Sequence, residues 1–477
     1  MSARSGRARR GRPAGRAALA AGGVRSGGPT RARTVALRVL ERVERTGAYA
    51  DLALHAAFAD GGIGPAERAL ATELVYGTLR WRGRLDWLLA QVIPRPLESL
   101  EGPVRSVLRL GAYQLAFLDA VPAPAAVDQA VRAARALGLQ RASGLVNAAL
   151  RRLARERATL VPPALADDPL GHLVHALSLP PWLAERWLRE LGPDEAAALA
   201  AASNVPPALC VRANRARCGR DSLLAELRAR WPGAHPTPLA PDGVVLGHGG
   251  SPAADPAFAA GLFAVQDEGS QLVVALLDPQ PGERVLDACA APGAKATAIA
   301  AQVGAQGNVV GLDRHAGRLA LVAREARRLG VEERLTLRAF DVATGLPPEA
   351  PAGGFDRVLV DAPCSGLGTL RRNPDLRWRV GPEDPAHLAE PQRALLASAA
   401  RALRPGGALV YSTCTMTAEE NEAVVRAFLA ETPSFRPASE DVLPASVRPV
   451  VAGGVLRTLP HRHGTDGFFA ARLEREG

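Results

Sequence analysis

The feature that most restricts the fold of this chain is an alternation of short apolar segments with amphipathic segments after about residue 263. The apolar segments are predicted β-strands and span residues 284–288, 309–313, 335–339, 357–361 and 408–412. Helices are predicted between them, and this order indicates an α/β domain with a mostly parallel sheet. Residues 467–473 are predicted to add an antiparallel edge strand.

The 477 residues exceed one ordinary hydrophobic core, so we expect several domains. Residues 34–157 are predicted to form an all-helical bundle, since apolar residues such as Val35, Val39 and Val43 recur at helical spacing. Prolines 94, 96, 122 and 124 are read as helix stops. Residues 158–262 are predicted to form a small α+β module, and residues 263–477 the α/β domain.

The positive charge of the chain is concentrated at its beginning. The net charge is +10, and residues 1–33 contain nine arginines and no acidic residue, which leaves the remainder nearly neutral. This segment is predicted to be a disordered basic arm that favours a polyanionic partner, with an organellar transit peptide as the alternative.

The sequence does not indicate a membrane protein, a disulfide-stabilised protein or a zinc protein. No apolar run approaches the length of a membrane-spanning helix. The five cysteines are scattered, with neither a CxxC pair nor a Cys/His cluster. We therefore expect a cytoplasmic protein with free thiols, no metal site and no membrane partner.

The first predicted strand leads into a loop of small residues before a helix, from Asp287 to Lys295. Small residues let a ligand approach the backbone, and the N–H groups of a helix N-terminus attract carboxylate or phosphate. The loop is neither GxGxxG nor a Walker P-loop, which disfavours dinucleotides and nucleoside triphosphates. Asp313 ends the second strand, where an acid can accept both ribose hydroxyls, and Asp341 follows the third. Together these residues predict an adenosine-containing cofactor without a pyrophosphate.

Two cysteines follow the fourth and fifth strands. Asp361 and Cys364 come after one strand, and Cys414 comes after the other. A lone cysteine is usually a small buried apolar residue. Because carboxyl ends of neighbouring parallel strands face one crevice, we expect both thiols and Asp361 to converge beside the cofactor.

Lys295 is the only lysine among 58 basic residues. Wherever a positive charge suffices, this chain uses arginine. Chance is the alternative, but the position of Lys295 inside the densest motif favours a requirement for a compact ammonium group.

These motifs resemble the RNA 5-methylcytosine methyltransferases, and within them the bacterial RsmB group that acts on 16S ribosomal RNA. The resemblance covers nearly everything after the basic arm, including a NusB-like helical domain with residues 145–151. It rests on segments 204–214, 266–271, 289–295, 361–364, 371–375, 412–414 and 466–469. The order of the two cysteine motifs is its most specific part.

The resemblance implies a cofactor, S-adenosylmethionine, and a role for each motif. The cofactor site would be lined by Cys289, Ala290, Ala291, Pro292, Gly293, Ala294, Lys295, Asp313, Asp341 and Asp361. Cys414 would be the nucleophile that adds to carbon 6 of cytosine, and Cys364 would assist product release. Asp361 would stabilise the adduct near the ring nitrogen N3. The target base must leave its stack to react.

The loop departs from the family pattern at two positions. A second glycine and a threonine are usual where this chain has Ala294 and Ala296. If residue 294 needed a positive φ, alanine would cost roughly 1 kcal/mol and weaken cofactor binding.

RNA contacts are predicted at two places. Arg371, Arg372 and Trp378 combine arginine with an aromatic ring, as single-stranded RNA recognition does, although an ordinary solvated surface is the alternative. Arg212 and Asn214 belong to the segment that resembles the family's module before the catalytic domain.

We therefore expect a monomeric enzyme that methylates carbon 5 of a cytosine in ribosomal RNA, most specifically 16S RNA, with naked RNA and the unassembled small subunit as alternative substrates. Three alternatives stay open. One is a non-enzymatic RNA-binding or antitermination-type factor with a degenerate methyltransferase domain. Another is a 5-methylcytosine methyltransferase for transfer RNA or DNA, and the third is an NAD oxidoreductase, which the missing GxGxxG disfavours.

Overall fold

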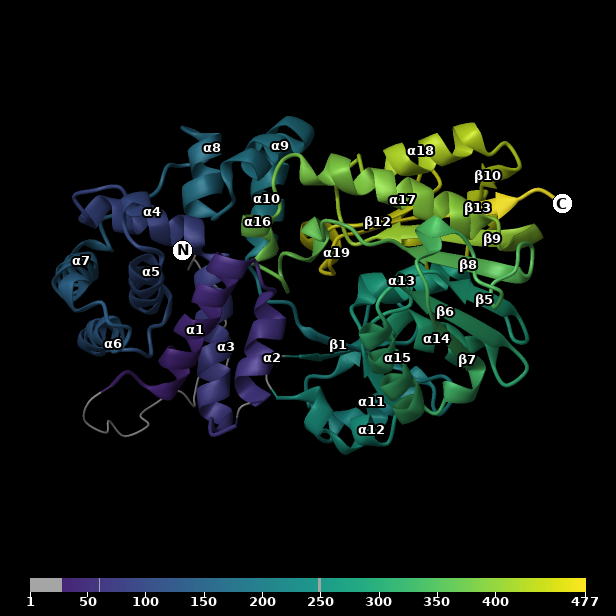
Figure 1. Cartoon of the computed structure of the whole chain (residues 1–477), viewed down its shortest axis with the longest axis horizontal. Coiled ribbons are helices and arrows are strands. Elements are labelled where there is room, and N and C mark those ends of the chain that lie inside the picture. The colour runs from purple at the N-terminus through teal and green to yellow at the C-terminus, as the bar shows by residue number, and fades with distance from the viewer. Residues whose placement is uncertain (1–27, 60, 248–249) are drawn as a thin grey trace, which may run out of the picture.

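The computed structural model describes residues 28–59, 61–247 and 250–477, which form a helical bundle, a small sheet module and a large α/β domain (Figure 1). Most of the expected basic arm lies outside these residues. The first helix, α1, begins at Arg31 inside the expected arm, and it buries Arg33, whose Nε donates a hydrogen bond to Gln114 at 2.8 Å.

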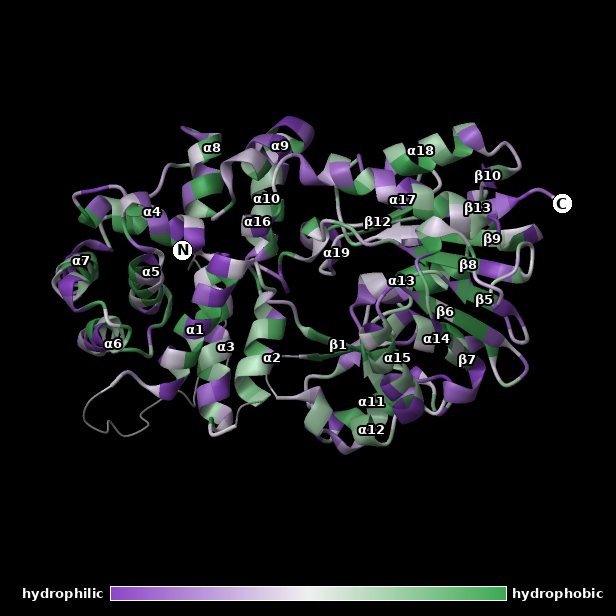
Figure 2. Cartoon of the chain, in the orientation of Figure 1, coloured by the Kyte–Doolittle hydropathy of each residue, from purple (hydrophilic) through white to green (hydrophobic). Residues whose placement is uncertain are grey.

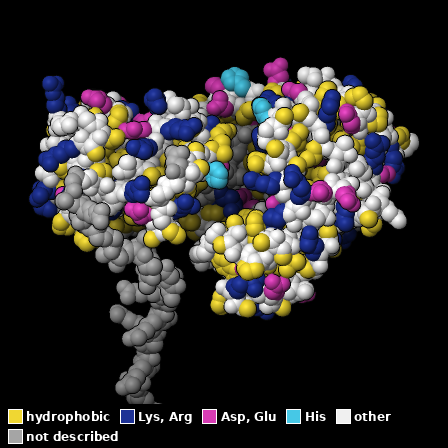
Figure 3. All heavy atoms as spheres, turned by 60° about the horizontal axis from the view of Figure 1, so that its bottom comes forward, with side chains coloured by type: hydrophobic (Ala, Val, Ile, Leu, Met, Phe, Trp, Pro, Cys, Tyr) yellow, Lys and Arg dark blue, Asp and Glu magenta, His cyan; other side chains and the backbone are white. Residues whose placement is uncertain are grey.

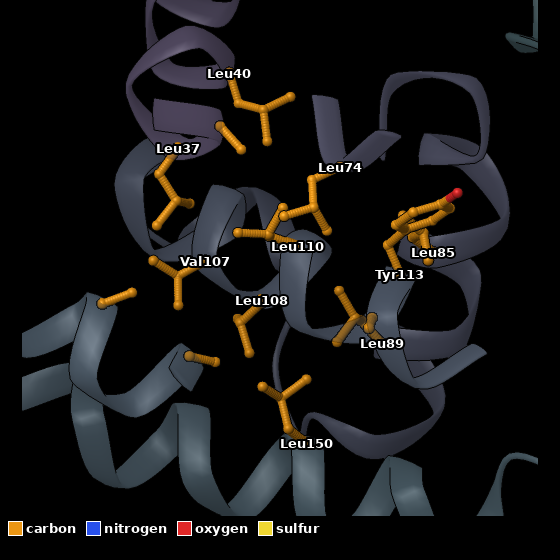
Figure 4. Packing of buried hydrophobic residues seen from close by; sticks show 14 of the residues in the cluster. Leu37, Leu40, Leu74, Leu85, Leu89, Val107, Leu108, Leu110, Tyr113 and Leu150 are labelled. Carbon is orange, nitrogen blue, oxygen red and sulfur yellow. The ribbon is translucent and has the colours of Figure 1, made fainter. Parts of the chain in front are cut away.

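The bundle comprises α1 (Arg31–Thr46), α2 (Ala50–Ala59), α3 (Pro65–Arg80), α4 (Arg82–Val92), α5 (Gly102–Phe117), α6 (Ala123–Ala136) and α7 (Ser143–Glu156). Helix α5 lies at its centre, and Val107, Leu108 and Leu110 pack against leucines of the surrounding helices (Figure 4). Pro122 and Pro124 stand at the start of α6. The prediction that they stop a helix was therefore wrong, because a proline is tolerated in a first turn, where its missing N–H has no partner to lose.

A short stretch of helices leads to the small module. It contains α8 (Pro169–Gly171), η3 (His172–Ala176), α9 (Pro181–Leu191) and α10 (Pro193–Ser203). The module has the strand order β2-β3-β1-β4 with antiparallel pairs, from β1 (Leu209–Ala213), β2 (His235–Pro236), β3 (Gly243–Gly247) and β4 (Phe263–Val265). Helices α11 (Arg220–Arg228) and α12 (Pro256–Ala259) accompany the strands. Because β4 pairs with β1, this sheet extends past residue 262, where the α/β domain was expected to begin.

The α/β domain is built on a sheet with the strand order β11-β12-β13-β9-β8-β5-β6-β7. Its parallel strands are β5 (Arg284–Asp287), β6 (Asn308–Asp313), β7 (Leu335–Ala339), β8 (Phe355–Asp361) and β9 (Leu403–Thr413). The antiparallel strands are β10 (Phe435–Pro437), β11 (Val451–Ala452), β12 (Val455–Thr458) and β13 (Phe468–Arg475). The predicted α/β class and the five parallel strands are confirmed.

The final strand differs from its prediction in one respect. Strand β13 is antiparallel as expected, but it pairs with β9 on one side and with β12 on the other. It is therefore not an edge strand. Its outer neighbours are short, and their apolar alternation is too brief to be recognised in sequence.

Helices cover both faces of this sheet (Figure 1). The helices α13 (Glu268–Leu277), α14 (Ala294–Val303) and α15 (Ala316–Leu329) pack on one face, with Leu359 and Val410 beneath them. The helices α17 (Asp384–Ala400) and α18 (Glu422–Glu431) pack on the other, above Val358 and Leu409. Alternate residues of one strand thus enter opposite cores, and the continuous apolar strands of Figure 2 follow from burial on both sides.

Two short helices complete the domain: α16 (Leu376–Arg379) and α19 (Pro460–His463). None of the described helices is long and apolar enough to cross a membrane.

Candidate active site

The loop after β5 is shaped by one glycine. Gly293 has φ of 113°, a left-handed conformation that side chains rarely adopt, and it directly precedes helix α14. Ala294 is the first residue of that helix and is not among the described residues with positive φ. The strain considered for Ala294 is therefore absent, because Gly293 alone makes the turn.

Asp287 is a buried carboxyl at the start of this loop. It is 1% exposed, its Oδ1 accepts the backbone N–H of Cys289 at 3.3 Å, and its Oδ2 has no hydrogen-bond partner in the described part of the chain. Burial and the nearby Asp361 raise the pKa of Asp287 to about 7. A cationic or hydrogen-donating ligand beside Oδ2 would satisfy this carboxyl.

Two further acids end the neighbouring strands. Asp313 is the last residue of β6; it accepts the N–H of His315 at 2.8 Å, while its Oδ2 lies 3.6 Å from Arg318. Asp341 follows β7, is exposed, and caps the backbone N–H of Ala343 at 3.0 Å. The backbone N–H of Phe340 donates to the carbonyl of Asp313, which holds the two strand ends together.

The sheet order brings the four predicted acids into one row. The strands β8, β5, β6 and β7 are consecutive neighbours, and they end at or just before Asp361, Asp287, Asp313 and Asp341 respectively. A row of carboxylates along the carboxyl edge of a parallel sheet suits an elongated ligand with several donors and positive charge. An anionic dinucleotide would be repelled there.

The two predicted cysteines meet at the next strand ends. The Sγ atoms of Cys364 and Cys414 are 3.3 Å apart, and the backbone N–H of Cys414 donates to the Cys364 sulfur at 3.3 Å. The hydrogen bond with Cys414, together with burial, raises the pKa of the Cys364 thiol well above its usual range. The expected convergence of both thiols is confirmed.

Asp361 is held beside these thiols by two donors. Lys295 Nζ donates to its Oδ2 at 2.8 Å, and Ser412 Oγ donates to its Oδ1 at 2.9 Å. Burial disfavours the charge of Lys295, but the pKa of this amine is raised because Asp361 and Cys414 lie next to it. The ammonium also lies 5.3 Å from the centre of the Phe468 ring. The single lysine of the chain is thus ion-paired with Asp361, and the Cys414 thiol is near enough to interact with its charge.

A buried carboxylate that the sequence did not reveal supports both cysteine loops. Glu420 is fully buried and accepts hydrogen bonds from the backbone N–H and Oγ of Ser365, at 2.8 and 2.6 Å. It also accepts from Thr417 at 2.7 Å and Gln392 at 3.1 Å. The only sequence signal was an acidic residue shortly after Cys414, and most such residues are solvated.

Two of the residues predicted to contact RNA, Arg212 and Asn214, occupy interior positions. Arg212 is 3% exposed and donates to Gln266 at 2.6 Å, and Asn214 is 1% exposed and donates to the carbonyls of Gly261 and Leu329, each at 2.8 Å. Both side chains donate their hydrogen bonds to other protein groups in the interior. The structure therefore does not bear out their predicted RNA contact.

The segment from Arg371 to Trp378 joins the parts of the molecule. Arg371 donates to the carbonyls of Val205 and Gly464, while Arg372 bridges Asp267 and Asp466, each at 2.6 Å. Trp378 donates to the carbonyl of Leu79 in the helical bundle at 2.6 Å. The donors of both arginines bind protein atoms. Neither of the two interpretations of the sequence, a solvated surface or an RNA contact, therefore fits Arg371 and Arg372. Trp378 remains half-buried.

Sequence comparison defines the family. A "Probable ribosomal RNA small subunit methyltransferase B" from Bacillus subtilis is 38% identical over 94% of this chain and 99% of its own length. The chain belongs to the RsmB/F methyltransferase family. The family model "16S rRNA methyltransferase RsmB/F" matches residues 274–474 of this member, the NusB family model matches residues 30–155, and the "ferredoxin-like domain" model of RsmF/B-like methyltransferases matches residues 179–251.

Other relatives agree with this assignment. A "Ribosomal RNA small subunit methyltransferase B" from Thermus thermophilus is 42% identical over 95% of this family member and 99% of the relative. Among solved structures, the protein PH0851 superposes with a TM-score of 0.76 at 27% identity, covering 93% of this chain and 99% of its own. A methyltransferase homolog from Pyrococcus horikoshii superposes with a TM-score of 0.54 at 28% identity, and the match covers 65% of this chain and 99% of the homolog. The predicted order of helical, small and methyltransferase domains is confirmed.

Proposed function

We propose that this family member transfers a methyl group from S-adenosylmethionine to carbon 5 of a cytosine in small-subunit ribosomal RNA. The observation that carries the proposal is the pair of Cys364 and Cys414 sulfurs, 3.3 Å apart, beside the Lys295–Asp361 ion pair. Two thiols at this edge suit chemistry that needs one nucleophile and one proton carrier. The relatives from Bacillus subtilis and Thermus thermophilus are named as small-subunit ribosomal RNA methyltransferases, which supports this substrate.

S-adenosylmethionine fits the row of acids. It offers an ammonium, a sulfonium, ribose hydroxyls and an adenine amine, which match the carboxylates of Asp287, Asp313 and Asp341. The Oδ2 of Asp287, which has no hydrogen-bond partner among the described residues, would gain one. The loop from Cys289 to Lys295 would lie against it, with the helix N-terminus of α14 facing its carboxylate. When bound, it supplies an electrophilic methyl group.

Cys414 is proposed as the nucleophile. Its thiolate would form a bond to carbon 6 of cytosine, which makes carbon 5 electron-rich enough to be methylated. The charge of Lys295 and the Cys414 sulfur are close enough to interact electrostatically, which places a cation near the proposed nucleophile. After methylation a solvent base takes the carbon 5 proton, the electrons of that carbon–hydrogen bond form the carbon 5–carbon 6 double bond, and the sulfur–carbon 6 bond breaks to release the product and the Cys414 thiolate.

Cys364 is proposed to remain a protonated thiol during nucleophilic attack. Its pKa is raised by the hydrogen bond with Cys414 and by burial, so it keeps its proton near neutral pH. A proton carrier 3.3 Å from the nucleophile can assist departure of the Cys414 sulfur at the end of the reaction. Asp361, oriented by Lys295 and Ser412, would hold the cytosine ring through N3 and its amine.

The domains are proposed to divide this work. The helical bundle would bind RNA, the small module would link it to the catalytic domain, and the monomer would act in the cytoplasm on 16S RNA before subunit assembly. A non-catalytic RNA-binding factor is disfavoured because Lys295 is paired with Asp361, and Cys364 is in contact with Cys414, at neighbouring strand ends.

The first test is bisulfite sequencing of ribosomal RNA from cells that carry the wild type, Cys414→Ala or Cys364→Ala. We expect Cys414→Ala to abolish one methylated cytosine. We expect Cys364→Ala to accumulate protein covalently bound to RNA, because sulfur departure is slowed. Unchanged methylation in both variants, with wild-type cofactor binding, would overturn the proposal.

A further inference from the structure

A cavity of about 550 Å³ lies where the helical bundle meets the catalytic domain. Its walls come from α1, α3, α4 and α5 of the bundle and from the α16 segment of the catalytic domain. The space-filling view in Figure 3 shows the surface hollowed between the helical and catalytic lobes. A cavity of this size accommodates a small organic ligand or a single nucleotide.

The walls combine positive charge with an aromatic face. Arg82 lies over the Trp378 ring, with its guanidinium carbon 5.1 Å from the ring centre. The nearest carboxylate to Arg82 is Asp86, at 3.9 Å, and that carboxylate already accepts two hydrogen bonds from Arg109. Arg82 is thus incompletely neutralised, and burial lowers its pKa. An anionic group in the cavity would compensate its charge.

One residue of the cavity wall also carries a buried hydroxyl without a partner among the described residues. Thr78 lines the cavity and is 3% exposed, and its Oγ1 has no hydrogen-bond partner among the described residues. A buried hydroxyl without a partner is unfavourable, and native proteins contain few of them. Because the oxygen has almost no exposed surface, a ligand oxygen in the cavity would satisfy it after a small movement of the wall.

Two carboxylates, Glu44 and Asp375, also line the cavity, so its walls carry both positive and negative charge. Glu44 is engaged by Arg105 at 2.9 Å, and it also accepts from Ser106 at 3.3 Å. Asp375 is 2% exposed, with Arg379 3.8 Å away. These carboxylates can accept hydrogen bonds from a ribose hydroxyl or a base amine. They would repel a ligand that carries only negative charge.

We propose that this cavity binds one unpaired nucleotide of the RNA substrate, distinct from the target cytosine. Arg82 and Thr78 would hold its phosphate, and the Trp378 region would contact its base. The inference rests on the proposed function, because the ligand is part of the same ribosomal RNA. A nucleotide held here would fix the RNA relative to both domains, since the cavity belongs to both.

Two variants test this proposal. For each, the affinity for in vitro transcribed 16S RNA is measured by filter binding at salt concentrations from about 50 to about 200 mM. Thr78→Val removes only a hydroxyl that makes no hydrogen bond, so the protein should stay folded. We expect it to weaken binding roughly threefold, as loss of one net hydrogen bond does. Arg82→Gln should weaken binding roughly tenfold and reduce the salt slope by about one.

The matched control is Arg141→Gln, which removes an exposed arginine of the same domain outside the cavity. Its affinity should stay within about twofold of the wild type, as for surface substitutions generally. Thermal unfolding of every variant checks that the fold is intact. Wild-type affinity in both Thr78→Val and Arg82→Gln would overturn the inference.

Photocrosslinking gives a second measurement. With 4-thiouridine-substituted 16S RNA, we expect crosslinked peptides from α3 or from the Trp378 segment, and we expect them to disappear in Arg82→Gln. Absence of these crosslinks in a wild type that methylates the RNA refutes the nucleotide site alone. A wild type that binds neither S-adenosylmethionine nor 16S RNA refutes the proposed function instead.

Discussion

At the scale of single residues, Asp287 carries a testable electrostatic consequence. Its folded-state pKa is raised to about 7 by burial and by Asp361, whereas an unfolded aspartate titrates near pH 4. The folded chain therefore binds more protons in this interval. The free energy of unfolding should fall as pH rises from about 4 to about 7, by up to about 4 kcal/mol from this group.

We expect Asp287→Asn to show a smaller fall across that interval, because amide nitrogen and oxygen do not titrate. Urea denaturation at pH 4.5 and 7.5 measures the difference, with the pH values chosen to bracket the interval. Asp466, whose pKa is also raised to about 7 by burial and by Asp267, should leave part of the fall in place. Identical falls in the two proteins would contradict the assignment.

At the scale of elements, the loop after β8 is packed tightly against the ends of β9 and β13. The N–H of Gly368 donates to the carbonyl of Cys414 at 3.0 Å, and its own carbonyl accepts from Gly467 at 2.8 Å. A Cβ at Gly368 would overlap the carbonyl of Gly467 and lie 2.8 Å from that of Cys414. No side chain fits between these backbones.

Gly368→Ala should therefore displace the Cys414 loop and lower kcat of RNA methylation about 10- to 100-fold, as small misplacements of a reacting group do. Gly381→Ala is the matched control, since its Cβ would meet only Asp384, at 3.7 Å. The measurement is single-turnover methylation of 16S RNA with both variants. Equal rates would show that the loop tolerates the added methyl group.

At the scale of the whole molecule, Arg377 is the buried junction of three parts. It is fully buried, and its guanidinium donates to the carbonyls of Arg80 and Ser178 and to the side chain of Asn204. Burial lowers its pKa to about 9, with Arg80 also close. One side chain from the catalytic domain thus satisfies acceptors in the helical bundle and in the connecting helices.

Arg377→Met should lower the free energy of unfolding by about 3 kcal/mol, because it leaves these buried acceptors unsatisfied. Arg404→Met, which breaks a half-exposed pair with Asp356, should cost less than about 1 kcal/mol. Chemical denaturation compares the two. A cost for Arg377→Met no larger than that of Arg404→Met would contradict the role of Arg377 as a junction.

The basic arm gives the second prediction at this scale. Because Arg33 is buried in α1 and bonded to Gln114, a clean deletion ends at residue 27. Removal of residues 1–27, which contain seven arginines, should weaken binding to 16S RNA and flatten its salt dependence, by up to about 0.9 in logarithmic slope per lost phosphate contact. An unchanged slope in filter binding would show that the arm does not contact RNA.

Much of the catalytic domain followed from sequence because its signals are local. Strands buried on both faces are continuously apolar, and the carboxyl ends of parallel strands share one edge. The convergence of Asp361, Cys364 and Cys414 follows from these two facts. The ion pair between Lys295 and Asp361 was not predicted, because Lys295 lies on helix α14 and not at a strand end. The roles of the two thiols came from family resemblance and stay a prediction.

Only the tertiary structure decided where the remaining polar residues lie. The basic segment from Arg371 to Arg379 resembles an RNA-binding surface in sequence, yet Arg371 and Arg377 are buried at the junction of the domains. Glu420 looks like an ordinary solvated acid, yet it anchors Ser365 beside Cys364. Composition and spacing cannot distinguish these cases, because whether a charged side chain meets water, RNA or protein depends on surfaces contributed by segments far away in the sequence, from 55 residues for Glu420 and Ser365 to 297 residues for Arg377 and Arg80.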